Sequence, residues 1–378
     1  TNPETVVVFP SSVSSWRDRI GLRRESSSHA KILGGSFIML IGSLVVSLAN
    51  FGYNIGVARL LGPSQFSHAA AAVTILMLIS AITLAFQLVC TKLVAKNETS
   101  ETKAAVFQRL RRRAWAVGIG IGASLIFASR AMTAYLQLQS PWLIILLAFG
   151  MTVYIPLGVK RGGLQGTCRF RGLAWSMAIE ALLKFVGAIV LVKVGCGVLG
   201  AVAAISGSVI IAYLLPDGAH ELRGAAVHDK PVSLGEAIQA IVFFVGQVII
   251  VNIDILMVKH FFKPEDAGVY AAVALVGRLL YFATWSVTSA MFPVSAGSSD
   301  REPTRSLLLV PMALVMGLSA GFIAVLDFFP HLIFRALFGA HFSTAVYGLD
   351  WLLTMNAAAS GIYAISVVLI TYEMSRRI

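Results

Sequence analysis

Long, almost uncharged apolar runs recur along this chain, and they restrict its possible folds more than any other feature. A bilayer core about 30 Å thick requires roughly 20 mostly apolar residues for each helical crossing. Ten stretches of about this length occupy residues 32–57, 67–93, 114–134, 141–158, 173–193, 197–215, 237–262, 266–293, 306–329 and 346–371. Strands of a lipid-facing barrel would be shorter and would alternate in polarity. The pattern therefore predicts an all-α membrane protein with about ten transmembrane helices.

Composition excludes the soluble alternatives. The chain is 57% hydrophobic and 13% charged, whereas a soluble globular domain is about a quarter charged. The three cysteines, Cys90, Cys168 and Cys196, are scattered without metal-ligand spacing. We therefore expect a protein that is not an enzyme and that has no cofactor, no metal site and no disulfide framework.

The net charge of +12 is unevenly distributed between the loops. With an even number of helices both termini lie on one side, and that side carries 22 of the 30 Lys and Arg residues, against 6 on the other. The six are Arg59, Arg130, Lys193, Lys259, Lys263 and Arg335. The positive-inside rule then predicts a multi-pass protein of the inner (cytoplasmic) membrane with both termini in the cytoplasm. The basic run at 109–113 lacks the interleaved aromatics of a nucleic-acid surface, so we expect it to contact membrane lipids.

Four segments follow from this pattern. Residues 1–31 are polar and Ser-rich and are predicted to form a cytoplasmic tail, since they lack the apolar core of a signal peptide. Residues 32–215 form a predicted six-helix bundle, 216–236 a cytoplasmic loop, and 237–378 a second bundle of four helices. The chain begins with Thr and ends just after an apolar helix, as a truncated chain would.

An internal repeat relates two of the predicted helix exits. Asn50 and Arg59 precede Pro63 in the first, and Asn252 and Lys259 precede Pro264 in the second, with the two prolines 201 residues apart. Six intervening helices give both units the same orientation, so the halves would be related by an axis along the membrane normal. This is a transporter architecture in which the substrate path lies between the halves. The alternative is that two helix exits of a membrane protein look alike without duplication.

The same residues carry a family resemblance. The segment ARLLGPSQF at 58–66, RGGLQGTCRF at 161–170 and PEDAGVY at 264–270 occur in the order seen in polysaccharide-export flippases. Asn252-Ile-Asp254, Gly277-Arg278 and Met291-Phe-Pro293 extend the match. The chain thus resembles the polysaccharide/O-antigen flippase branch of the multidrug/oligosaccharidyl-lipid/polysaccharide (MOP, MATE-like) exporter superfamily. It departs from the pattern at Ser67, where the family usually has Gly, and in having ten predicted helices where twelve or more are usual.

The resemblance implies a MATE-like fold of two parallel-repeat bundles, the second incomplete here. It also implies a transporter that flips undecaprenyl-diphosphate-linked oligosaccharide outward by alternating access for polysaccharide biosynthesis. A coupling proton or sodium ion is a further candidate partner.

Ionisable residues inside the predicted helices are the strongest site candidates. Such a residue costs at least about 2.5–3.5 kcal/mol at a helix centre, so it faces protein or water and has a reason to be there. Lys184 and Arg278 lie near mid-membrane, one in each half. Glu180 lies four residues before Lys184, and Asp254 lies at a depth compatible with Arg278. The groups either form two ion pairs that fix helix packing, or the two cations grip a diphosphate while Glu180 and Asp254 serve as pairing or coupling groups.

Polar side chains in the repeated exits are further candidates for substrate binding. Asn50, Asn54 and Asn252 are placed to bind sugar hydroxyls, and Arg59 to bind substrate at the helix exit. For each asparagine the alternative is a hydrogen bond between helices.

Two glycine patterns have structural interpretations. Gly52-x-x-x-Gly56 and Gly118-x-x-x-Gly122 predict close helix packing. The stretch Gly162-Gly163-x-x-Gly166 is predicted to be a cytoplasmic turn, because a phosphate-binding loop would need a preceding strand.

Two other functions compete with the flippase. A cation-coupled multidrug exporter of the same superfamily would favour acidic groups in the cavity over cations. A membrane-embedded glycosyltransferase or polymerase would present catalytic acids on a large outer loop, and the longest predicted outer loop, 330–345, contains no Asp or Glu.

Overall fold

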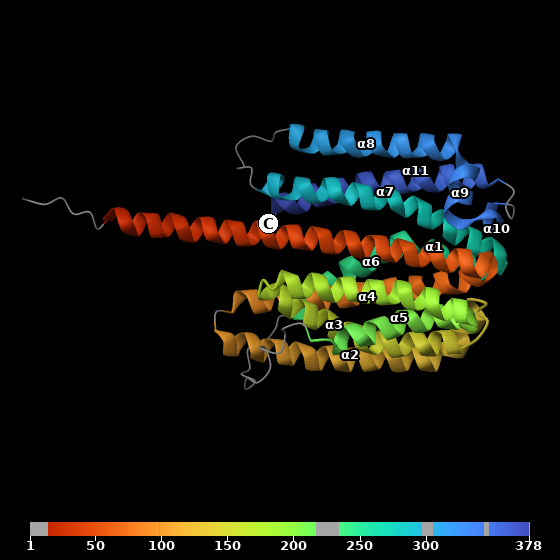
Figure 1. Cartoon of the computed structure of the whole chain (residues 1–378), viewed down its shortest axis with the longest axis horizontal. Helices are drawn as coiled ribbons and strands as arrows, with labels where there is room; N and C mark the ends of the chain where they lie inside the picture. The colour runs from red at the N-terminus through yellow and green to blue at the C-terminus, as the bar shows by residue number, and fades with distance from the viewer. Residues whose placement is uncertain (1–13, 98, 217–233, 297–304, 344–347, 378) are drawn as a thin grey trace, which may run out of the picture.

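The structure is a computed structural model that describes residues 14–97, 99–216, 234–296, 305–343 and 348–377, and its regular elements in these residues are all helices, joined by short turns. The elements are α1 Ser14–Lys96, α2 Ser100–Tyr135, α3 Trp142–Gly166, α4 Phe170–Leu191, the π-helical turn η1 Val192–Cys196, α5 Gly197–Leu214, α6 Leu234–Phe261, α7 Pro264–Ala296, α8 Arg305–Phe328, α9 Pro330–Phe338, α10 Ala340–Ser343 and α11 Leu349–Arg377. Figure 1 shows them as a layered set of nearly parallel and antiparallel rods. The expectation of an all-α protein is confirmed for these residues.

Two reversals of the chain occur without a loop. Within α1, Gly62 adopts φ +75°, a conformation that favours glycine, and Pro63 begins the returning segment. Between α4 and α5, Gly195 and Gly197 have φ values of +98° and +53°. Figure 1 shows α1 turning back on itself at the end opposite to its start. The helix ends predicted near Pro63 and near residue 195 are therefore reversals made by glycine.

Six helical stretches among the described residues are long and apolar enough to cross a membrane. They are Ile38–Lys96, Ser100–Tyr135, Trp142–Gly166, Phe170–Leu214, Leu308–Phe328 and Trp351–Ile370. The first has 59 residues and the fourth 45, which is about 88 and 68 Å of helix at 1.5 Å per residue, or at least twice a bilayer core. Each of these two stretches therefore has the length of two crossings. The count of ten stays a prediction.

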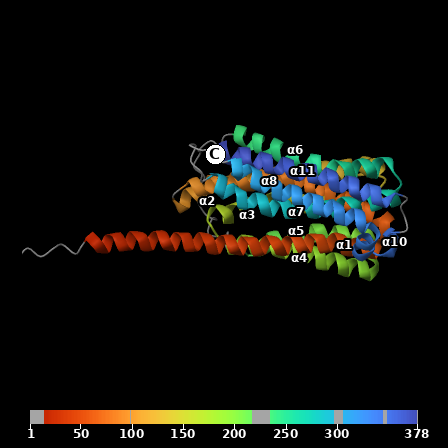
Figure 2. The same cartoon turned by 90° about the horizontal axis from the view of Figure 1, so that it is seen from above.

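The helices pack as two groups joined by α1. In one group α1 contacts α3 and α4, α2 contacts α3, and α5 contacts α3 and α4; in the other, α11 contacts α7 and α8. The returning part of α1 connects the groups through α6 and α7. In Figures 1 and 2 the start of α1 and the end of α11 lie at one end of the rods, called the terminal end below. The Gly62 reversal, η1 and α9 lie at the opposite, far end.

Glycines bring the helices of the first group into close contact. A Cβ at Gly52 would lie 3.2 Å from Phe185, and one at Gly118 would lie 2.3 Å from the carbonyl oxygen of Thr152. Both predicted glycine pairs are thus confirmed as packing positions. The prediction of a turn at residues 162–166 is wrong, because these residues continue α3 and pack against α1. A Cβ at Gly162 would lie 2.4 Å from the carbonyl oxygen of Gln87.

Replacing Gly158 with valine is expected to destabilise the protein by about 1–3 kcal/mol, since overpacking costs this much. A Cβ at Gly158 would lie 2.5 Å from Thr83 Cγ2 and 2.7 Å from the Thr83 carbonyl oxygen. The matched control is Gly120→Val, because nothing lies within 4 Å of a Cβ at Gly120. Thermal unfolding of both variants in detergent measures the difference. Equal melting temperatures would contradict this contact between α1 and α3.

Candidate functional site

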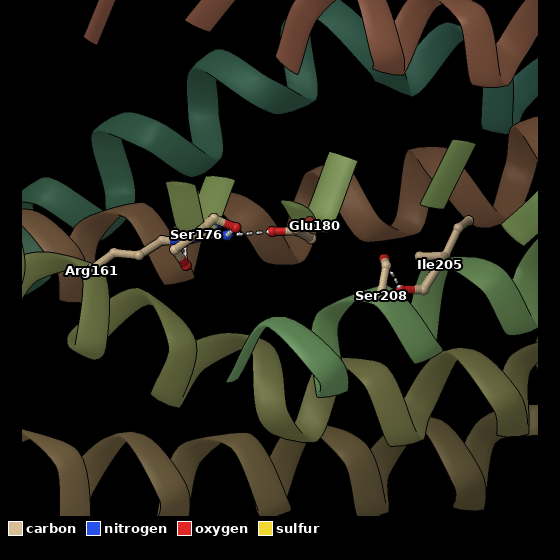
Figure 3. A network of polar contacts seen from close by, with 5 residues as sticks. All are labelled: Arg161, Ser176, Glu180, Ile205 and Ser208. Carbon is tan, nitrogen blue, oxygen red and sulfur yellow. Dashed lines mark hydrogen bonds and ion pairs between the residues drawn. The ribbon is translucent and has the colours of Figure 1, made fainter. Parts of the chain in front are cut away.

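The carboxylate of Glu180 is paired with an arginine from another helix. Arg161 Nη2 on α3 lies 2.7 Å from Glu180 Oε2 on α4, and both side chains are buried. Arg161 also donates to the hydroxyl and the carbonyl of Ser176, and Figure 3 shows this network between the two helices. The predicted pair of Glu180 with Lys184 is not formed, because Arg161 reaches the carboxylate from the facing helix.

Lys184 makes a different contact. Its ammonium group lies 5.7 Å from the ring centroid of Tyr53 on α1, within the range of a cation–π interaction. Tyr53 is buried and donates a hydrogen bond of 3.3 Å to the Ala201 carbonyl. Among the described residues Lys184 has no ion pair.

Arg278 also lies apart from its predicted acidic partner. Its guanidinium donates to Asn252 Oδ1 at 2.6 Å and contacts Met77 Sδ at 3.7 Å. Asp254 Oδ2 instead accepts a hydrogen bond of 2.8 Å from the Tyr270 hydroxyl. The buried Asp254 Oδ1 has no hydrogen-bond partner among the described residues. The predicted ion pair between Asp254 and Arg278 is therefore not formed.

The contact between Arg278 and Met77 has a particular position in the repeat. These residues are 201 positions apart, as are Pro63 and Pro264. If the prolines are equivalent, Met77 and Arg278 are equivalent too. Two equivalent positions touch only close to the axis that relates them, so on that condition the contact lies near the axis between the halves.

Two of the three candidate asparagines donate hydrogen bonds within their own helices, and the side-chain oxygen of the third has no partner among the described residues. The Asn54 side-chain amide donates to the Asn50 carbonyl, and the Asn252 amide donates to the Val248 carbonyl, each at 2.8 Å within its own helix. Asn50 Oδ1 is buried and has no partner among the described residues. Asn50 therefore offers a free acceptor, whereas Asn252 is already engaged by Arg278.

Arg59 lies at the far end and binds the end of α9. Its Nε donates to the Leu337 carbonyl at 2.7 Å, and its Nη2 donates to the Ala336 carbonyl. A cation at a helix C-terminus satisfies carbonyls that have no partner in the helix. Arg59 thus caps α9 and connects it to α1. It follows Tyr53, which contacts Lys184, further along α1.

Further contacts close the far end between the two groups of helices. Lys259 on α6 is buried and donates to Ser67 Oγ at 2.8 Å. The His260 ring stacks on Tyr135 with centroids 3.9 Å apart, and its Nδ1 lies 2.6 Å from the Tyr135 carbonyl oxygen. We call these contacts, together with those of Arg59, the far-end seam.

A phenylalanine cluster packs beneath the seam. Phe334, Phe338 and Phe342 of α9 and α10 are buried, and Phe342 lies 6.0 Å from Phe66 of α1 between ring centroids. The outer loop predicted at 330–345 instead contains two helices, and this cluster was not predicted. Its spacing of four residues was the available signal, since such spacing puts side chains on one helical face.

The sequence matches no protein-family model, and no curated protein is significantly similar to it. Several solved structures share its fold. One is described as an inward-facing conformation of a multidrug resistance MATE family transporter of the MOP superfamily, with a TM-score of 0.65 and 14% identity over 87% of this chain and 83% of that one. An outward-facing conformation of such a transporter has a TM-score of 0.53 and 14% identity over 91% and 84%.

A third similar structure is a MOP superfamily transporter from Pyrococcus furiosus, with a TM-score of 0.50 and 14% identity over 91% of this chain and 84% of that one. Its description states that reverse polarity of its binding pocket suggests a different function. The expectation of a MATE-like fold is confirmed by these likenesses.

Proposed function

We propose that this protein is a membrane transporter that flips lipid-linked oligosaccharide, carried on undecaprenyl diphosphate, across the cytoplasmic membrane by alternating access. Three observations support the proposal: the fold is shared with MOP superfamily transporters, the flippase-like segments are present, and Lys184 and Arg278 have no ion pair among the described residues. In this proposal residues 32–215 and 237–378 are the two moving bundles.

The observation that carries the proposal is the pairing of the central charges. Glu180 is neutralised by Arg161, which leaves Lys184 without a carboxylate. Arg278 binds a neutral amide and a thioether. The two candidate cations, one in each proposed bundle, therefore have no carboxylate partner among the described residues, which supports a role in binding an anion. A diphosphate matches the chemistry of these groups, since a guanidinium binds phosphate through two parallel hydrogen bonds and an ammonium binds it as a point charge.

The free acceptor of Asn50 suits the sugar part of such a substrate. Its buried Oδ1 lacks a partner among the described residues, and an unsatisfied buried polar atom costs about 1–3 kcal/mol. A sugar hydroxyl would satisfy it. Asn54 acts in this account through its bond to the Asn50 backbone, and Asn252 positions Arg278.

In an alternating-access transporter the far-end seam would act as a gate. If the terminal end is cytoplasmic, the seam closes the path to the outside, and the structure represents the state that receives substrate from the cytoplasm. The higher TM-score against an inward-facing transporter than against an outward-facing one agrees with this assignment. Arg59, expected to bind substrate, becomes a gate residue instead.

Replacing Arg59 with glutamine should open the far end, because the carbonyls at the end of α9 lose a charge-assisted donor. Such bonds contribute about 1.5–3 kcal/mol, so the open population should rise about ten- to a hundredfold. The probe is Ala69→Cys, buried near the seam at 1% exposure, on a background without the native cysteines. An impermeant thiol reagent applied to intact cells measures its labelling rate.

The matched control is Lys193→Gln, which removes an exposed cation at the same end. It should leave the labelling rate unchanged. Equal rates for Arg59→Gln and the control would show that Arg59 does not hold the gate.

Labelling with an impermeant thiol reagent also tests the proposed topology. Single cysteines near Lys103 and near Phe262 lie at opposite ends of the helices. We expect the impermeant reagent to label the second and not the first in intact cells, because the positive-inside rule places the end of Lys103 in the cytoplasm. The reverse pattern would overturn the orientation.

A cation-coupled multidrug exporter is the second candidate. It is favoured by Asp254, whose buried Oδ1 has no partner among the described residues and could bind a proton or sodium ion, and by the multidrug transporters that share the fold. A glycosyltransferase is less well supported. The outer segment 330–345 has no acidic residue, and most of it forms α9 and α10.

Complementation separates these functions. The full-length gene is expressed in a host whose polysaccharide flippase has been deleted, and surface glycan and efflux of a cationic dye are both measured. Restored glycan without dye efflux is the expected result. Dye efflux without restored surface glycan would show that the protein is a multidrug exporter and not a flippase.

A further inference from the structure

An open groove runs between the first part of α1 and α4, towards the terminal end. Its volume is about 630 Å³, and its lining includes Ile38, Ile41 and Val45 from α1 and Arg171, Trp175 and Ala178 from α4. Ligand sites in proteins have volumes of about 300–1,000 Å³. Among the described residues that line the groove, Arg171 is the only charged one, and the others are apolar or glycine. It is the second residue of α4, so the charge lies at the terminal-end mouth of the groove.

The groove faces outward from the helix bundle. Trp175 is 63% exposed, and Leu44 and Leu48 on the neighbouring face of α1 are 55% and 64% exposed. In Figure 2 α1 and α4 lie together on the same face of the molecule, opposite to α6. If the helices span a bilayer, this face contacts lipid. Trp175 lies one turn from Arg171 near the start of α4, and tryptophan is enriched near the membrane interface.

The groove is separated from the central cations. Lys184 follows Trp175 by nine residues, which at about 100° per residue places it on the opposite side of α4. Between the two sides the helices are in close contact. A Cβ at Gly42 would lie 2.8 Å from Ala174 Cβ, and one at Gly56 would lie 2.4 Å from Ile189 Cδ1. A chain in the groove therefore does not continue into the space around Lys184.

We propose that the groove binds one anionic glycerophospholipid of the surrounding leaflet, with an acyl chain along Ile41, Val45 and Ala178 and its phosphate on Arg171. The apolar lining matches the chain, and the single cation at the mouth matches the headgroup. Among the described residues the Arg171 guanidinium has no hydrogen bond or ion pair, so it is open to the phosphate.

The closed contact between α1 and α4 decides between two sources of this chemistry. In the proposed function the diphosphate of the lipid-linked sugar binds Lys184 and Arg278, and the close contact of Gly42 with Ala174 separates the groove from Lys184. The occupant is therefore a bilayer phospholipid and not the transported lipid. This choice of occupant rests on the proposed function.

Lipid retention tests the site. The full-length protein is equilibrated with phosphatidylglycerol carrying deuterated chains, purified in detergent, and its bound lipid is counted by native mass spectrometry. We expect wild type to retain one phosphatidylglycerol. A cation near a membrane surface contributes about a fivefold change in affinity, so Arg171→Gln should lower retention about fivefold.

Two further variants keep the test decisive. Arg112→Gln removes an exposed cation towards the same end and should leave retention unchanged. Val45→Phe fills the groove and should lower retention without altering the charge; only folded protein, selected by gel filtration, is counted. Equal retention in the Arg171 and Arg112 variants would overturn the proposal, since the lipid would then be held by the bulk surface. Displacement of phosphatidylglycerol by equimolar undecaprenyl diphosphate would also overturn it and assign the groove to the transported lipid.

Discussion

Replacing Glu180 with glutamine in the full-length protein should remove most of the folded protein from the membrane. The change leaves the Arg161 guanidinium buried without its carboxylate, and breaking a buried ion pair from one side costs about 3–5 kcal/mol. Native proteins have only about 5–15 kcal/mol of stability. Protein level, measured by fluorescence-detected gel filtration of membrane extracts, should therefore fall severely.

The partner of Glu180 is identified by compensation. Arg161→Met combined with Glu180→Gln removes both charges and should restore the protein level. Lys184→Met combined with Glu180→Gln should not, because Lys184 contacts Tyr53 and has no ion pair with Glu180. If Lys184→Met restores the protein level of the Glu180→Gln variant and Arg161→Met does not, the partner of Glu180 is Lys184, as the i,i+4 spacing suggested.

Replacing Arg278 with glutamine should lower glycan export about ten- to a hundredfold while leaving the protein folded. The expected loss corresponds to one charge-assisted interaction of about 1.5–3 kcal/mol. Folding should survive because Asp254 is held by the Tyr270 hydroxyl and not by Arg278. Lysine should replace Arg278 poorly, since it lacks the bidentate fork. Surface glycan per inserted protein is the measurement, and Lys184→Gln should give a similar loss.

Two controls separate substrate binding from packing. Met77→Leu removes the thioether contact of Arg278 and should leave export nearly unchanged. The double variant Arg278→Gln with Asp254→Asn should stay inactive if Arg278 binds the diphosphate. An active double variant would show that Arg278 only balances the charge of Asp254.

The helix breaks could be predicted because single residues determine them. Gly62 with Pro63, the residues around Gly195, Pro264 and Pro330 were all expected to end helices, and the structure ends or reverses helices at each. The turn expected at 162–166 fails for a physical reason. Glycine is a poor helix former in isolation. Here Gly162 lets α3 approach the Gln87 carbonyl on α1, and this packing outweighs the low helix propensity of glycine.

The candidate charges could be located from sequence, but their partners could not. Spacing along one helix suggested Lys184 for Glu180, whereas the observed partner comes from α3, 19 residues away. Arg59 caps a helix 278 positions further along the chain. Such contacts depend on the relative placement of helices, which hydrophobic periodicity does not contain.

The most direct test of the central claim is transport by the purified full-length protein in proteoliposomes, with undecaprenyl-diphosphate-linked oligosaccharide as the substrate. We expect wild type to move this lipid between leaflets faster than empty liposomes, and the double variant Lys184→Gln with Arg278→Gln to be no faster than empty liposomes. The same double variant moving the lipid at the wild-type rate, or wild type moving only a cationic dye, would contradict the account.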